Sequence, residues 1–300
     1  MFAVQFSEYG GPEVLGVGEA PEPHAGPGQV RIKVAAASVN PFDWKVREGY
    51  LAQGAPLDGV GYLGYDAAGV VDEVGDGVHD VAVGDDVFGL GQHTQAEFAV
   101  LTAWAAKPAS VDWAAAAAAG VAAETAERGL RLLGVKAGST IFIDGGAGGV
   151  GSVAVQFAVA ADARVIASAS QPNHDYLREI GATPVLYGEG LVNRIRAVPG
   201  AAVDLVFDTA GKTPIDDLVA LVPDPSDVVS IANFDAAQAG ARVTTGAPDK
   251  RPEVALPLAA QLLADSRLVI KVQTFPFDRV QEAYQISQSG HLRGKLVLIP

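Results

Sequence analysis

The chain contains no cysteine among its 300 residues. Disulfide bonds, thiolate nucleophiles, iron–sulfur clusters and every zinc site that needs a cysteine ligand are therefore excluded. Histidine is scarce as well, and the five residues His24, His79, His93, His174 and His291 stand singly, without the spacing of a metal site. The sequence therefore predicts no bound metal.

Basic residues are few, with 21 Lys and Arg against 35 Asp and Glu, so the formal net charge is −14 and the pI is near 4.7. Proteins that bind nucleic acids or anionic membranes use an excess of Lys and Arg. The charge balance therefore argues against both kinds of partner.

Long hydrophobic runs are also missing. The longest run, from Trp113 to Ala123, stops at Glu124, short of the roughly 20 residues that a membrane span needs. The N-terminus has neither the basic nor the continuous apolar part of a signal peptide. We therefore expect a soluble, cytoplasmic protein.

The residues that are present predict an α/β protein with two parts. Short β-rich runs punctuated by Gly, Pro and Asp indicate a largely antiparallel first part; they lie at 30–37, 67–75, 85–90 and 96–101. From residue 139 strands and helices alternate, which is typical of a doubly wound parallel sheet. Its strands are expected at 139–144, 164–169, 183–187, 203–208, 227–232 and 241–245, with helices from about 149 and at 173–180.

Two further segments connect these parts. The alanine-rich stretch 114–119 and the residues after it predict a helix between them, because alanine has the highest helix propensity. Residues 267–300 read as strand, helix and strand. This segment is short for a domain of its own, so we expect it to pack on the first part.

A glycine-rich turn is the sharpest motif in the chain. Gly146, Gly148 and Gly151 form G-x-G-x-x-G after an apolar strand and before an amphipathic helix. In such a turn the glycines let backbone amides, here those near Gly149 and Val150, approach a pyrophosphate at the positive end of the helix. The motif predicts dinucleotide binding; a purely structural glycine turn is the alternative.

The residues after the next strand favour NADPH over NADH. NAD-specific sites place an acidic residue there to bind the ribose hydroxyls, whereas this chain has Ser168 and Ser170, followed by Asn173. Hydroxyl and amide groups can donate to the 2′-phosphate of NADP, which a carboxylate would repel. The alternative is that the two serines simply end a strand.

Several segments together resemble the zinc-free quinone oxidoreductases (ζ-crystallin-like) of the medium-chain dehydrogenase/reductase superfamily. Besides the glycine turn, these segments are FSEYGGPEVL at 6–15 and the stretches 27–49, 64–75, 83–90 and 290–298. The resemblance implies a GroES-like catalytic domain, residues 1–117 and 267–300, and a Rossmann NADPH-binding domain, residues 118–266, with NADPH in the cleft between them.

The same resemblance shows that the ligands of a catalytic zinc are missing. Asn40 stands where zinc alcohol dehydrogenases have a cysteine, and Gly64, Tyr65 and Asp66 stand where they have Gly-His-Glu. Without a metal to polarise the substrate, a simple ketone reacts poorly. A quinone or an α,β-unsaturated carbonyl is the better acceptor, because conjugation stabilises the charge after hydride arrives.

The resemblance also places catalytic residues. It puts Asn40 beside the nicotinamide and the substrate, although Asn40 could instead only form a turn with Pro41. Lys45 and Tyr50 occupy the places near which relatives carry tyrosines, and they are candidates for proton donation, with exposed loop side chains as the alternative.

Further residues are expected at the cofactor by resemblance. Thr125 matches a threonine near the nicotinamide, although its neighbours Glu124 and Glu127 replace residues that are usually apolar. Tyr187 matches a tyrosine near the adenosine phosphate. The remaining candidates are Ile231, Ala232 and Asn233 near the nicotinamide ribose, and Arg293 and Lys295, whose alternative is a solvated face.

The sequence therefore predicts an NADPH:quinone reductase acting on a small molecule. An NADPH-dependent enone or alkenal double-bond reductase and a low-turnover NADPH-binding sensor remain open. The strand at 241–245 is expected at an edge of the sheet, where pairing with a second copy would give a homodimer.

Overall fold

The computed structural model describes residues 1–200, 202–290 and 292–300, so His291 lies outside the described residues. The chain forms two compact units. The first comprises residues 1–121, 252–266 and 270–300, and the second comprises residues 122–251 and 267–269.

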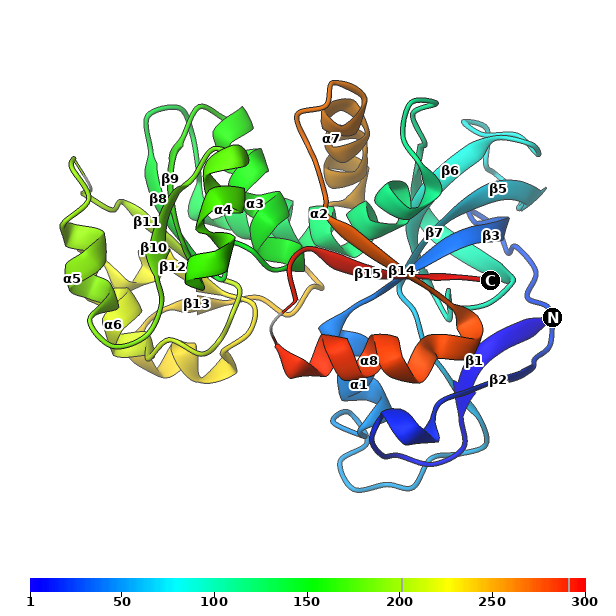
Figure 1. The fold of residues 1–300 in the computed structure, drawn as a ribbon. Coiled ribbons are helices and arrows are strands. Elements are labelled where there is room, and N and C mark those ends of the chain that lie inside the picture. The colour runs from blue at the N-terminus through cyan, green and yellow to red at the C-terminus, as the bar shows by residue number, and fades with distance from the viewer. Residues whose placement is uncertain (201, 291) are drawn as a thin grey trace. The chain divides into compact units, whose positions relative to one another are not determined.

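The first unit is built on a mixed sheet of six strands (Figure 1). Their order is β14 (Val272–Pro276), β15 (Lys295–Ile299), β3 (Val30–Val39), β5 (Asp66–Val74), β6 (Asp86–Gln92) and β7 (Phe98–Ala106). β3 also pairs with β7, which curls this part of the sheet into a barrel. β15 pairs antiparallel with β3, so the C-terminal segment completes the first unit, as expected.

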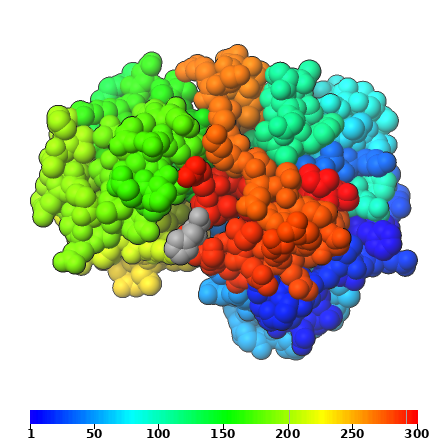
Figure 2. All heavy atoms as spheres, in the orientation of Figure 1, coloured from blue at the N-terminus to red at the C-terminus, as the bar shows by residue number. Residues whose placement is uncertain are grey.

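A small second sheet and three helices cover this barrel. The sheet has the order β2 (Gly16–Glu19), β1 (Phe2–Phe6) and β4 (Gly61–Tyr62). The helices are α1 (Pro41–Arg47), α7 (Pro252–Ala264) and α8 (Val280–Ser289). Figure 2 shows α8, in orange to red, at the surface next to the blue N-terminal segment, where Gln281 Nε2 donates to the carbonyl oxygen of Leu15 at 2.9 Å.

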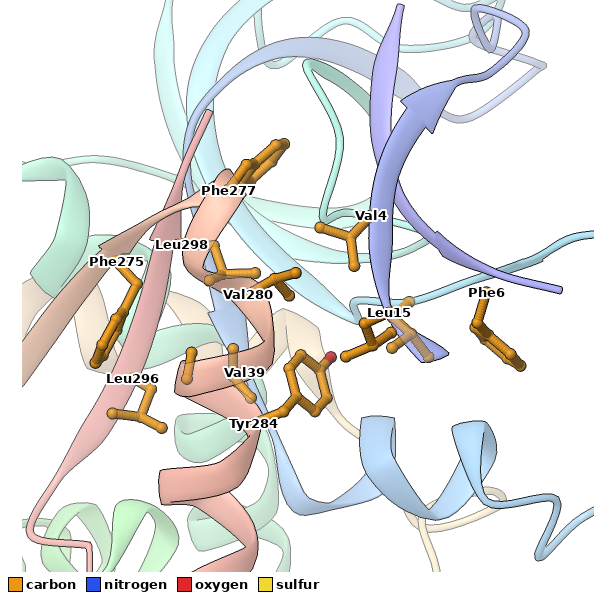
Figure 3. Close-up of a cluster of buried hydrophobic side chains, with 12 residues drawn as sticks. Val4, Phe6, Leu15, Val39, Phe275, Phe277, Val280, Tyr284, Leu296 and Leu298 are labelled. Atoms are coloured by element: carbon orange, nitrogen blue, oxygen red, sulfur yellow. The ribbon is translucent and has the colours of Figure 1, made fainter. Parts of the chain in front are cut away.

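A hydrophobic cluster joins these pieces. Val4, Leu15, Val39 and Leu296 are all at most 3% exposed. Figure 3 shows them gathered around the buried ring of Tyr284 on α8. Apolar burial therefore ties the two ends of the chain together.

The second unit is a parallel sheet with the order β10 (Thr183–Leu186), β9 (Arg164–Ala169), β8 (Thr140–Asp144), β11 (Leu205–Asp208), β12 (Val228–Ser230) and β13 (Arg242–Val243). Every residue of β8 is buried, because helices cover both faces of the sheet. On one face Phe142 packs in a core with residues of α5 (Leu191–Arg196) and α6 (Ile215–Val219). β13 is an edge strand, as expected.

The other face is covered by α2 (Trp113–Leu133) and α3 (Gly149–Ala160), with α4 (His174–Glu179) following β9. α2 approaches the sheet closely at Gly129, where a Cβ atom would lie 2.2 Å from the ring of Phe207. The predicted fold class, a GroES-like β-rich part with a doubly wound parallel sheet, is confirmed.

Four helices, α1, α5, α6 and α7, were not located from the sequence, and of these only α5 and α6 follow from the expected alternation of strands and helices. α1 is short and starts with proline, whose missing N–H is harmless at the first helical position. α7 belongs to the first unit, where it packs on β7. The proposed domain boundaries at 117/118 and 266/267 stay a prediction.

Candidate active site and cofactor site

Four polar side chains are buried together in the first unit and are named here the Asn40 cluster. Asn40, Asp43, Asp66 and Lys295 are at most 4% exposed. Asn40 follows β3, Asp43 lies in α1, and Asp66 and Lys295 begin β5 and β15, the two neighbours of β3. The ends of three adjacent strands therefore bring the cluster together.

The side-chain amide of Asn40 is held in one orientation. Its Nδ2 donates to Asp66 Oδ1 at 2.7 Å, and its Oδ1 accepts from Lys295 Nζ at 2.5 Å. A carboxylate can only accept and an ammonium can only donate, so the amide cannot be reversed. Nδ2 carries a second hydrogen, which can be donated to a ligand in a hydrogen bond.

Asp43 fixes the backbone around this amide. Its Oδ2 accepts from the N–H of Asn40 at 2.6 Å and its Oδ1 accepts from the N–H of Gly64 at 2.9 Å. Gly64 has φ +103°, and a Cβ atom there would lie 2.5 Å from Thr94 Oγ1. Position 64 therefore requires glycine.

Burial dominates the electrostatics of the cluster. It raises the pKa of Asp43 to about 7, helped by the negative charge of Asp66. Burial also raises the pKa of Asp66, against the Lys295 charge, and lowers the pKa of Lys295, against both carboxylates. Since two carboxylates share one ammonium, the cluster tends to hold an extra proton near neutral pH.

Tyr65 is a candidate proton donor that was not predicted from the sequence. Burial, followed by the charge of Asp43, raises its phenol pKa to about 12, so the hydroxyl is protonated at neutral pH. Its ring lies edge-on to Phe42, with centroids 5.0 Å apart. Its place in the sequence could have indicated this role, because Tyr65 stands where the zinc alcohol dehydrogenases have histidine.

Lys45 and Tyr50, the other predicted catalytic residues, lie around Trp44. Lys45 Nζ is 5.6 Å from the centre of the Trp44 ring. The Tyr50 ring packs edge-on against Trp44 at 6.4 Å and is 66% exposed. Their catalytic roles stay a prediction.

The glycine turn of the second unit joins β8 to α3. Gly148 is the N-cap of α3, and the first N–H groups of a helix, here those of Gly149 and Val150, have no partner within it. A Cβ atom at Gly151 would lie 2.1 Å from the carbonyl oxygen of Gly145. At Gly146 it would lie 2.6 Å from the Cβ of Ala167.

Two Asp–Ser pairs shape the carboxyl edge of this sheet. Ser168 on β9 donates to Asp144 on β8 at 2.5 Å, and Ser230 on β12 donates to Asp208 on β11 at 2.6 Å. Ser168 Oγ also accepts from the N–H of Gly145 at 2.9 Å. Ser168 is 1% exposed, and its hydroxyl donates its hydrogen bond to Asp144, so it supports the glycine turn. Its contact with a 2′-phosphate stays a prediction.

The other predicted cofactor residues of the second unit follow strand ends at this edge. Ser170 and Asn173 come after β9, where Asn173 Nδ2 donates to Ser170 Oγ at 3.1 Å, and exposed Tyr187 comes after β10. After β12, the N–H groups of Ala232 and Asn233 donate to Ser230 Oγ. Ile231 begins this segment, and Thr125 lies on α2 in the same unit.

Arg293 and Lys295 belong to the first unit. Arg293 is exposed just before β15. Lys295 was expected at the cofactor, but its Nζ is buried against Asn40 and the carbonyl oxygen of Val39 at 3.4 Å. The structure therefore gives Lys295 the role of a buried counter-charge to Asp66.

The described residues hold neither a metal-binding cluster nor a membrane-spanning helix. In residues 1–200, 202–290 and 292–300, no group of three or more His, Cys, Asp and Glu side chains is arranged to hold a metal. No helix in these same ranges is long and apolar enough to cross a membrane.

Fold and site together define an oxidoreductase of the medium-chain dehydrogenase/reductase class. Residues 26–128 match the alcohol dehydrogenase GroES-like domain, and residues 149–257 match the family model described as zinc-binding dehydrogenase.

Relatives narrow this class. An NADPH-dependent alkenal/one oxidoreductase of Arabidopsis thaliana is 32% identical over all of this chain and 80% of its own length. A chloroplast envelope quinone oxidoreductase homolog of the same plant is 31% identical, over all of this chain and 98% of its own. The solved quinone oxidoreductase of Coxiella burnetii is 29% identical with a TM-score of 0.83, over 100% of this chain and 99% of its own. The chain belongs to the quinone oxidoreductase family of this superfamily.

Proposed function

We propose that this chain is an NADPH-dependent, zinc-independent quinone reductase. The observation that carries the proposal is the amide of Asn40, which Asp66 and Lys295 hold with one N–H to spare. A fixed donor of this kind can stabilise negative charge that develops on an acceptor oxygen.

The second unit has the features that NADPH requires. The glycine turn leaves room for a pyrophosphate at the N-terminus of α3. After β9 the chain continues with Ser170 and Gln171, so no carboxylate stands where it would repel a 2′-phosphate. A relative covering the whole chain is named as NADPH-dependent. When bound, NADPH supplies the hydride.

The residues of the Asn40 cluster suit an acceptor better than a metal. Asn40 Oδ1 is already used by the ammonium of Lys295, 2.5 Å away. A metal ion bound there would have to displace that positive charge. The cluster therefore favours an acceptor whose own conjugation accommodates charge, with Asn40 donating to its oxygen.

A second candidate is the saturation of a conjugated carbon–carbon double bond. It is favoured by the 32% identity with an alkenal/one oxidoreductase. This reaction needs a proton at carbon, and Tyr65, whose phenol is protonated at neutral pH, is the proposed donor; its pKa of about 12 makes it a weak acid. Lys45 and Tyr50 are proposed as further donors.

We also propose a homodimer that pairs through β13. This strand lies at the edge of the parallel sheet, and an unpaired edge is a template for a second copy. Light scattering should then give twice the chain mass of 30.8 kDa. A monomeric mass that persists at high protein concentration would refute the dimer. The cytoplasmic location stays a prediction.

Oxidation of NADPH with 1,4-benzoquinone and with a simple enone, with the products identified, tests the function. The quinone should be reduced, and Asn40→Ala should lower kcat by roughly 100-fold or more, the effect of losing one oxyanion donor. Asn193→Ala, which removes an exposed amide on α5, is the matched control and should leave kcat unchanged.

Each other outcome points elsewhere. A saturated enone without quinone turnover would support the second candidate. NADPH binding without turnover of any acceptor would support the sensing role instead.

A further inference from the structure

The second half of α2 carries two Glu–Arg pairs, Glu124 with Arg128 and Glu127 with Arg131. Glu124 pairs with Arg128 one turn later, with Oε1 to Nε at 3.0 Å and Oε2 to Nη2 at 3.3 Å. Both side chains are at most 5% exposed. Glu127 pairs in the same way with Arg131 at 2.9 Å.

Both arginines extend from α2 to the segment of residues 244–250, named here the 244–250 segment. Arg128 Nη1 donates to Thr244 Oγ1 at 2.7 Å, and that hydroxyl lies 3.0 Å from Asp249 Oδ2. Arg131 Nη2 donates to the carbonyl oxygen of Asp249 at 2.5 Å. The two ends of the segment are therefore fastened to one helix.

The 244–250 segment starts at the carboxyl edge of the sheet. It directly follows β13, and the N–H of Thr244 donates to the carbonyl oxygen of Ser230 at 3.1 Å, next to Ile231. Arg128 Nη2 also lies 3.4 Å from Thr125 Oγ1. One guanidinium therefore links two places, Thr125 and the surroundings of Ile231, that are both expected at the nicotinamide end of the cofactor.

We propose that Arg128 is a positioning residue for NADPH: it holds the 244–250 segment against α2 and thereby sets the wall of the cofactor site beside Thr125 and Ile231. This inference rests on the proposed function, because it assumes that NADPH binds at this edge. Ligands of doubly wound sheets bind at the carboxyl ends of the strands, where this segment begins.

Stability alone does not explain the buried pair. A buried ion pair is often no more stabilising than apolar residues of similar volume, although removing one partner alone is costly. Apolar side chains at 124 and 128 would pack as well, but they could not donate to Thr244. Apolar replacement of the pair should therefore weaken cofactor binding while leaving folding stability nearly unchanged.

The test compares wild type with the double variant Glu124→Leu/Arg128→Leu. We expect the double variant to fold with a melting temperature near that of wild type. Its Kd for NADPH, measured by fluorescence titration, should rise roughly tenfold, and KM for NADPH should rise with it while kcat changes less. The single variant Arg128→Met should lose stability, because it leaves the Glu124 carboxylate buried and unpaired.

Limited trypsin digestion measures how often the 244–250 segment opens when no cofactor is bound. Lys250 is exposed at the end of the segment, so cleavage of the Lys250–Arg251 bond is the reaction that is followed. The double variant should be cut there several-fold faster than wild type, because a released segment opens more often. Arg164→Met is the matched control: it removes an arginine that donates to the carbonyl oxygen of Gly200 from the opposite end of β9, and it should change neither readout.

The outcomes are distinguishable. A folded double variant with wild-type NADPH affinity, or with wild-type trypsin cleavage, overturns the positioning role and leaves the proposed function standing. A wild-type protein that binds no NADPH overturns the proposed function and the positioning role with it. Weaker NADPH binding together with faster cleavage in the double variant, with neither change in Arg164→Met, supports the proposal.

Discussion

Replacing Lys295 by methionine removes the ammonium of the Asn40 cluster while keeping most of the side-chain volume. Lys295 is 4% exposed and donates to Asn40 Oδ1 at 2.5 Å. Its loss leaves the carboxylates of Asp43 and Asp66 buried without this counter-charge. The amide of Asn40 also loses the group that fixes its carbonyl oxygen.

Breaking a buried ion pair by removing one partner costs about 3–5 kcal/mol. At about 2 °C per kcal/mol for a chain of this size, the melting temperature should fall by about 6–10 °C at neutral pH. The sign of the pH effect follows from Asp43, whose pKa of about 7 is raised above its ordinary 3.8. At pH 5.5 this carboxyl is protonated in both proteins, whereas at pH 7.5 it is largely ionised in wild type. The penalty of Lys295→Met should therefore shrink by up to about 1 kcal/mol between pH 7.5 and pH 5.5.

Scanning calorimetry of wild type and Lys295→Met at about pH 7.5 and pH 5.5 measures both effects. The double variant Lys295→Met/Asp66→Asn is the control, because a neutral pair of amides at 40 and 66 can satisfy each other. It should regain at least half of the lost stability without regaining activity, since the Asn40 amide would reverse. Equal melting temperatures of wild type and Lys295→Met at both pH values would refute the reasoning.

Three further predictions concern single positions. The pKa of Asp43 is raised to about 7, so this carboxyl contributes its full stability below its unfolded pKa of 3.8 and loses that contribution as the pH rises through 7. The free energy of unfolding of wild type relative to Asp43→Asn, measured with urea, should therefore fall by about 2–4 kcal/mol from pH 5 to pH 8. A difference that stays constant with pH would contradict this prediction. Gly151→Val should raise the Kd for NADPH at least roughly tenfold, because a Cβ there lies 2.1 Å from the Gly145 oxygen, whereas Gly16→Ala, with no atom within 4 Å, should not. Ser170→Asp should raise KM for NADPH roughly tenfold and spare KM for NADH in steady-state assays, since only the 2′-phosphate is repelled; an equal effect on both cofactors would contradict the proposed preference.

Local patterns in the sequence were sufficient for most of the fold. The strand expected at 164–169 is β9 (Arg164–Ala169), and the helix expected from about 149 is α3, because apolar periodicity and glycine placement act locally. α1 was missed because it has only seven residues, with proline first and a tryptophan and a valine of modest helix propensity.

The candidate site was less predictable, because its chemistry depends on contacts between distant residues. Asn40 and Lys295 are separated by 255 positions, and nothing local to Lys295 indicates that it would be buried. Asp43 looks like an ordinary helix-start residue until Gly64 donates to it from another loop. Ser168 fits a phosphate ligand by position, yet its bond to Asp144 is only visible in three dimensions.

The most direct test of the central claim is the oxidation of NADPH by chelator-treated protein with 1,4-benzoquinone, followed by the loss of NADPH absorbance and corrected for the rate without protein. The account predicts turnover that persists in chelator, exceeds the rate with NADH and falls sharply in Asn40→Ala. Turnover that disappears with chelator and returns with added zinc, or that is unchanged in Asn40→Ala, would contradict it.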